Sequence, residues 1–333
     1  MTAARNRTLW TWAKVLSGGV VLAVLVWRLG TGPFLDAFGT IDGRALAAAG
    51  TLTALTTVCA AWRWKLVARG LGVDIAMRSA VAAYYRSQFL NTTLPGGVVG
   101  DVHRAVRHGR DVGDVGRGLR AVVWERTAGQ VVQVAMTLLV LLLLPSPVHS
   151  AMPLVAVAVV TATAGAILFG RALPRGGPAL WARIVRTSAA DLRDGLLARR
   201  AWPGIVLASV LIVAGHAATF LIAARTAGST ASTMRLLPLA LLVLLAMAVP
   251  TNIAGWGPRE GVAAWAFSVA GLGADQGVAT SVVYGVMVLV ACLPGAVVLI
   301  AGWLRQDTRV LETEAQLPVR QLATTSPGGV AHD

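Results

Sequence analysis

Long apolar runs alternate with short polar and basic segments along most of this chain. A helix needs about 20 apolar residues to cross the hydrocarbon of a bilayer. Six runs have about this length: 9–29, 45–66, 121–144, 152–169, 205–224 and 278–304. The pattern predicts an all-α, polytopic membrane protein with about six full spans within residues 1–304. The remaining residues, 305–333, are polar and predict a disordered cytoplasmic tail.

Two further apolar segments are interrupted by breaks rich in proline and glycine. The segments with their breaks are 77–90 with 91–101, and 236–249 with 250–261. Each break has an asparagine near its start and an acid near its end: Asn91 and Asp101 in the first, Asn252 and Glu260 in the second. Helix breakers and charges at membrane depth are tolerated where the backbone is buried in protein or lines a polar cavity. We therefore predict two re-entrant helical hairpins, which in corresponding halves would point to a transport site.

Lysine and arginine are concentrated in alternate loops. Residues 63–120 and 171–200 are rich in basic residues, nearly all of them arginine, whereas the loops 145–150 and 226–234 have neither lysine nor arginine. By the positive-inside rule both termini are cytoplasmic, and we expect a multi-pass plasma-membrane protein. Residues 1–145 and 151–304 then each have the order span, span, hairpin, span. The first half begins in the cytoplasm and the second on the opposite side of the membrane, which predicts an inverted repeat. The alternative is coincidence, because the chain has 36 glycines.

Composition supports a membrane protein and argues against several other classes. The 333 residues are 56% hydrophobic and 13% charged, whereas soluble domains are about a quarter charged. The net charge of +14 lies in loops, which fits anionic lipid headgroups better than nucleic acid. The two cysteines lie in apolar runs, and the sequence has no metal-ligand spacing, Walker loop, nucleophile elbow or HExxH motif. We predict no metal, no cofactor and no enzymatic activity.

The first break contains groups that suit an anion. Its residues are Asn91, Pro95, Gly96, Gly97 and Asp101, and Arg104 follows. Glycines expose backbone N–H groups, and the N-terminus of a returning helix carries partial positive charge, so the hairpin could bind a headgroup phosphate. The alternative is a cytoplasmic surface turn that caps a helix.

The second break places charge after a long uncharged arm. Asn252, Gly255, Arg259 and Glu260 lie between apolar segments. A buried arginine needs partners, and a phosphate matches its forked donors. We favour headgroup binding by Arg259, with Glu260 balancing charge or carrying a proton. The alternative is an Arg–Glu pair that locks the hairpin.

Three more ionisable residues lie at or inside predicted spans. Glu125 and Arg126 start one span, and adjacent helical residues point about 100° apart. Arg126 could therefore reach an acid in a hairpin, and Glu125 could face Arg104 or Arg259; alternatively they are an interfacial pair. His216 lies in the middle of a span, where it could relay protons or make an interhelical hydrogen bond.

Three motifs together resemble those of a known family. They are Phe-Leu-Asn-Thr-Thr-Leu-Pro-Gly-Gly-Val-Val-Gly-Asp (89–101), Glu-Arg-x-x-Gly (125–129) and Pro-x-Asn-x-Ala-Gly-Trp-Gly-Pro-Arg-Glu-Gly (250–261). The chain resembles the membrane domain of lysylphosphatidylglycerol synthases, a flippase-like family, from about residue 9 to 304. The resemblance implies a membrane protein that moves a lipid between leaflets. The chain departs from full-length synthases because it ends after the last span with a short tail, so aminoacyl transfer is not expected.

We therefore predict a flippase for an anionic, aminoacylated or polyprenyl-phosphate-linked lipid. Its expected partners are membrane lipids, with a homo-oligomer or a separate lipid-modifying enzyme as further partners. Phosphate would be held by Arg126 and Arg259, and a cationic headgroup or proton by Asp101, Glu125 and Glu260. Two alternatives remain: a membrane enzyme that uses these three acids for acid–base chemistry, or a scaffold that recruits a separate synthase.

Overall fold

The computed structural model describes residues 39–94, 97–144, 187–247, 258–302 and 304, and within them the chain is helical with no strand. The elements in chain order are α3 (Gly43–Gly70), α4 (Met77–Thr93), α5 (Val99–Asp111), α6 (Val115–Leu143), the π-helix η2 (Asp191–Leu196), α9 (Trp202–Thr226), α10 (Thr233–Ala246), α11 (Pro258–Val269) and α12 (Ala274–Ala291).

Four of the described helices are long and apolar enough to cross a membrane. They are Gly43–Gly70, Val115–Leu143, Trp202–Thr226 and Ala274–Gly302, the last of which extends α12 past a turn at Cys292. They match four of the predicted spans, so the prediction of a helical membrane protein is confirmed. The other two predicted spans, 9–29 and 152–169, lie outside the described residues, as does the predicted disordered tail.

Helix ends follow local signals in the sequence. Asp42 caps α3 by accepting a hydrogen bond from the backbone N–H of Ala45 at 2.7 Å. Asp114 caps α6 in the same way through Arg117, at 2.8 Å. These aspartates satisfy N–H groups that have no partner within the helix. α4 ends at Thr93, inside the first predicted break.

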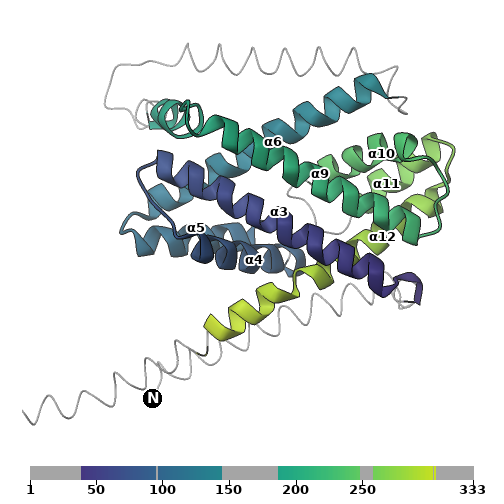
Figure 1. Cartoon of the computed structure of the whole chain (residues 1–333), viewed down its shortest axis with the longest axis horizontal. Coiled ribbons are helices and arrows are strands. Elements are labelled where there is room, and N and C mark those ends of the chain that lie inside the picture. The colour runs from purple at the N-terminus through teal and green to yellow at the C-terminus, as the bar shows by residue number, and fades with distance from the viewer. Residues whose placement is uncertain (1–38, 95–96, 145–186, 248–257, 303, 305–333) are drawn as a thin grey trace, which may run out of the picture.

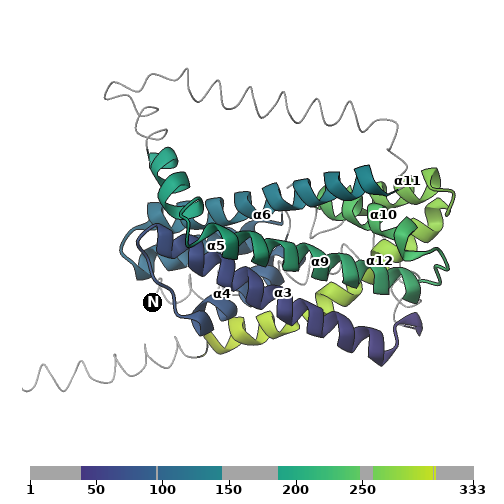
Figure 2. The ribbon, with the colours of Figure 1, turned by 45° about the horizontal axis from the view of Figure 1, so that its top comes forward.

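The helices form two groups packed against each other through α3 and α9. The pair α4–α5 packs against α3 and α6, and the pair α10–α11 packs against α9 and α12. Figures 1 and 2 show these two short pairs at opposite ends of the bundle. The larger apolar core lies in the second group, where Phe220, Phe267 and Tyr284 are fully buried. Trp64 and Tyr84 belong to the core of the first group.

The packing of α5 on α4 depends on the absence of a side chain at Gly100. A Cβ atom there would overlap the backbone carbonyl of Ser87. The small residue lets two backbones approach closely, as is typical of helix contacts in membranes. This contact fixes the start of α5, which carries Asp101 and Arg104.

We expect Gly100→Ala to destabilise the protein by about 1–3 kcal/mol, the usual cost of overpacking. The thermal midpoint of the detergent-purified protein, followed by tryptophan fluorescence, measures this. The matched control is Gly50→Ala, because a Cβ at Gly50 meets nothing within 4 Å and alanine favours helix over glycine. If Gly100→Ala melts at or above the wild-type temperature, the close approach does not support the fold.

Candidate functional site

A single buried carboxylate joins four helices. Glu125 of α6 is 0% exposed. Its Oε1 accepts hydrogen bonds from Arg63 Nε of α3 at 2.8 Å and from the Tyr84 hydroxyl of α4 at 2.7 Å. Its Oε2 accepts from Arg104 Nη2 of α5 at 3.0 Å. Both carboxylate oxygens are therefore satisfied, as a charge removed from water requires.

Asp101 continues this network toward Arg126. Its Oδ1 lies 3.1 Å from Arg104 Nη2, and its Oδ2 lies 2.6 Å from Arg126 Nη2. Ser87 and Asn91 of α4 donate further hydrogen bonds to it, at 2.9 and 3.1 Å. The expected contact of Arg126 with a hairpin acid is present, and so is that of Glu125 with Arg104.

Asp101 stays ionised at neutral pH. Burial alone would raise the pKa of its carboxyl, but the Arg126 and Arg104 guanidinium groups outweigh burial and lower the pKa to about 2. A depressed pKa means that these ion pairs stabilise the fold above the usual carboxyl range near pH 4. That contribution is lost as the pH falls through about 2.

Arg104 is completely buried and lies between two aromatic rings. Its guanidinium carbon is 4.1 Å from the ring centroid of Tyr84 and 4.5 Å from that of Trp64. Cation–π contact therefore stabilises the part of the guanidinium that makes no hydrogen bond. His108 packs edge-on against Trp64, and burial lowers the pKa of His108, which disfavours a further positive charge beside Arg104.

The network carries more positive than negative charge. Within the described part of the chain, three arginines, Arg63, Arg104 and Arg126, are joined to two acids, Asp101 and Glu125. Two of the arginines are nearly inaccessible, whereas the Arg126 side chain is 42% exposed. The excess charge is therefore presented at Arg126.

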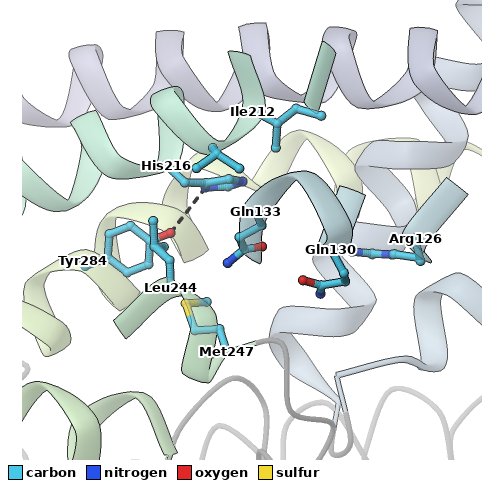
Figure 3. A pocket seen from close by; sticks show the side chains of 9 residues that line it. Arg126, Gln130, Gln133, Ile212, His216, Leu244, Met247 and Tyr284 are labelled. Carbon is cyan, nitrogen blue, oxygen red and sulfur yellow. Dashed lines mark hydrogen bonds between the residues drawn. The ribbon is translucent and has the colours of Figure 1, made fainter. Parts of the chain in front are cut away.

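Arg126 faces a cavity of about 200 Å³ inside the helix bundle. Figure 3 shows its polar lining: Arg126, Gln130 and Gln133 from α6, His216 from α9 and Tyr284 from α12. The Tyr284 hydroxyl lies 3.3 Å from His216 Nδ1, so His216 makes an interhelical hydrogen bond. The apolar lining is Ile212, Val213, Leu244 and Met247.

A second cavity, of about 210 Å³, adjoins the first and extends toward the first hairpin. The two share Arg126, Ile212, His216, Met247 and Tyr284 in their linings. The second is also lined by Arg63, Tyr84 and Gln88, and by Asn91 and Gly97 of the first predicted break. The first hairpin thus contributes to a polar space that continues between the two groups of helices.

The charges of the second hairpin pair with each other. Arg259 is 4% exposed, and its Nε lies 2.8 Å from Glu260 Oε1 and 2.9 Å from Ser281 Oγ of α12. The Tyr284 ring centroid lies 5.6 Å from its guanidinium carbon. Neither Arg259 nor Glu260 lines the two cavities described above. The Arg–Glu pair of the alternative interpretation is therefore present, and headgroup binding by Arg259 stays a prediction.

The other predicted site residues are only partly described. Pro95, Gly96, Asn252 and Gly255 lie outside the described residues. Conversely, sequence reasoning did not select Arg63 as a site residue, although an arginine inside an apolar run is itself an indication of a functional site. It also missed Tyr84 and Tyr284, for which the local sequence gives no signal.

The fold and this site define a polytopic helical membrane protein with a cavity among its helices that is lined by arginine, amide and apolar side chains. Residues 11–295 match the family described as the lysylphosphatidylglycerol synthase TM region, and the chain belongs to this family. The predicted membership is thus confirmed, and it relates the chain to lipid modification or transport. No curated protein matches the chain.

We expect Glu125→Gln to lower the stability of the detergent-purified protein by about 3 kcal/mol, because it leaves buried guanidinium groups without their counter-charge. The thermal midpoint measures the loss. The matched control is Asp74→Asn, which removes exposed ion pairs with Arg69 and Lys65 and should leave the midpoint nearly unchanged. Equal midpoints for the two variants would show that the Glu125 network does not hold the helices together.

Proposed function

We propose that this protein is a flippase that moves an anionic, aminoacylated or polyprenyl-phosphate-linked lipid between the leaflets of the plasma membrane, with both termini in the cytoplasm. The lipid headgroup would pass through the joined cavities while its acyl or prenyl chains remain in the bilayer. The observation that carries the proposal is the half-exposed Arg126 side chain in a cavity among helices long and apolar enough to span a membrane.

The size and chemistry of the cavity support a headgroup as the occupant. Pockets that bury a whole drug-sized ligand measure about 300–1,000 Å³, so each of the two cavities, at about 200 and 210 Å³, has room for a headgroup without its chains. Arginine binds phosphate oxygens through forked, charge-assisted hydrogen bonds. Polar residues at this depth are costly and are usually retained for use.

The packing pattern supports the inverted repeat that such a transporter would use. Exchanging α3, α4, α5 and α6 for α9, α10, α11 and α12 preserves most of the helix contacts. For example, α5 packs on α6 as α11 packs on α12, and α6 packs on α9 as α12 packs on α3. The short pairs α4–α5 and α10–α11 lie at opposite ends of the bundle (Figure 2). We propose that they are re-entrant hairpins that enter the membrane from opposite sides.

The state of the acids favours transport over an enzymatic role. General acid–base chemistry needs a carboxyl that reaches the substrate and exchanges a proton near neutral pH. Asp101, Glu125 and Glu260 each form an ion pair with arginine, and none of them lines the two cavities. We therefore include no chemical step in the proposed function.

Leaflet exchange of a labelled phosphatidylglycerol in vesicles containing the purified protein tests the proposal. We expect exchange well above that of protein-free vesicles, and we expect Arg126→Ala to slow it at least tenfold by removing a charged hydrogen bond. Arg110→Ala is the matched control, because Arg110 is exposed at the end of α5, and it should exchange lipid at the wild-type rate. Exchange no faster than in protein-free vesicles, for phosphatidylglycerol, its lysyl ester and a polyprenyl phosphate alike, would refute the proposal.

A further inference from the structure

We infer that the cavity accepts a phosphate-bearing headgroup without an amine and discriminates against an aminoacylated one. This inference rests on the proposed function and narrows its cargo from three lipid classes to the purely anionic ones. It runs against the simplest expectation from the family description, in which the headgroup carries a lysyl group.

The charged residues that line the two cavities all have the same sign. They are Arg63 and Arg126, and no Asp or Glu is among the described lining residues. A cationic headgroup needs a carboxylate or a set of carbonyl groups to replace its hydration. The described lining offers it the amide oxygens of Gln130 and Gln133 but no carboxylate, and it adds two guanidinium groups.

The nearest carboxylates are already occupied. Both oxygens of Asp101 accept hydrogen bonds from Ser87 and Asn91. Both oxygens of Glu125 accept hydrogen bonds from Arg63 and Arg104. An ammonium group could reach them only by displacing an arginine from a buried ion pair, which costs more than the new pair returns. The acids that the sequence suggested for a cationic headgroup thus serve to hold the arginines.

Arg126, in contrast, has capacity for an anion. One of its Nη atoms is bound to Asp101 at 2.6 Å, whereas its Nε is buried and has no hydrogen-bond partner. The Oε1 atom of Gln130, one turn along α6, is also buried without a partner. A phosphate can accept from the guanidinium, while the Gln130 oxygen can accept a hydrogen bond from a headgroup hydroxyl.

The same charges repel an amine. The network of Arg63, Arg104, Arg126, Asp101 and Glu125 has one more positive than negative charge. An ammonium group in the cavity is repelled by this charge, and the repulsion is strong because the dielectric constant there is low. An unfavourable contact with the wrong ligand is a common source of specificity. A lysyl ester, whose two amines give its headgroup a net positive charge, should therefore bind least well.

Binding of six-carbon-chain lipids to the full chain in detergent, followed by native mass spectrometry, tests the inference. We expect phosphatidylglycerol or a short polyprenyl phosphate to bind at least tenfold more tightly than lysyl-phosphatidylglycerol, the size of one charged hydrogen bond. Whichever of phosphatidylglycerol and the polyprenyl phosphate binds more tightly shows which class of phosphate lipid the cavity prefers. Arg126→Ala should abolish the preference and Arg110→Ala should keep it. Equal or tighter binding of the lysyl lipid to the wild-type protein overturns the inference.

A reversed preference gives a second test. Gln133→Glu places an isosteric acid in the cavity wall, and it should strengthen binding of the lysyl lipid and weaken that of phosphatidylglycerol, each by about tenfold. Gln130→Glu serves if Gln133→Glu does not fold, as judged by its thermal midpoint. A folded variant that keeps the wild-type preference contradicts the inference.

The binding and exchange experiments separate the two proposals. If the headgroup preference holds but no lipid crosses the bilayer, the flippase proposal fails and the inference about the cavity stands. If lipids cross but the lysyl ester binds best, the flippase proposal stands and the inference fails.

Discussion

The carboxylate of Glu125 can be buried only if donors from several helices meet at it. Arg63, Tyr84 and Arg104 come from α3, α4 and α5 and satisfy both of its oxygens. Because lipid tails provide little hydrophobic drive for helices to associate, such polar contacts and close packing must hold the bundle. Arg104 in turn holds Asp101, and Asp101 holds Arg126 at the cavity. The position of Arg126 thus depends, through Arg104 and Asp101, on the carboxylate of Glu125, to which Arg126 forms no ion pair.

Sequence reasoning succeeded where lipid imposes the constraint. The four described spans were predicted because a helix that crosses a bilayer must be apolar over a fixed length. The end of α4 was predicted because the following proline and glycines cannot continue a helix. The family assignment followed from three motifs, two at the breaks in this pattern and one at the start of a span. None of these features requires knowledge of which helices touch.

The site was harder to predict because ion pairing depends on packing. Glu125 and Arg126 are adjacent in sequence, yet Glu125 contacts Arg63 and Arg104 while Arg126 contacts Asp101. Arg259 and Glu260 are also adjacent, but they pair with each other. Two adjacent pairs of the same residue types, in opposite order, therefore pair differently, because the neighbouring helices offer them different partners. Tyr84 and Tyr284 could not be predicted as site residues, because most aromatic residues on a membrane helix only pack against neighbouring helices.

The ion pair between Asp101 and Arg126 joins a short helix, α5, to a spanning helix, α6. The electric field in the cavity therefore depends on the distance between α5, which carries Asp101, and α6, which carries Arg126. If the two helices slide apart, the guanidinium loses its counter-ion and attracts an anion more strongly. If they close, the attraction weakens. A shift of α5 relative to α6 would therefore change the affinity of the cavity for an anion, even though Asp101 on α5 does not line the cavity.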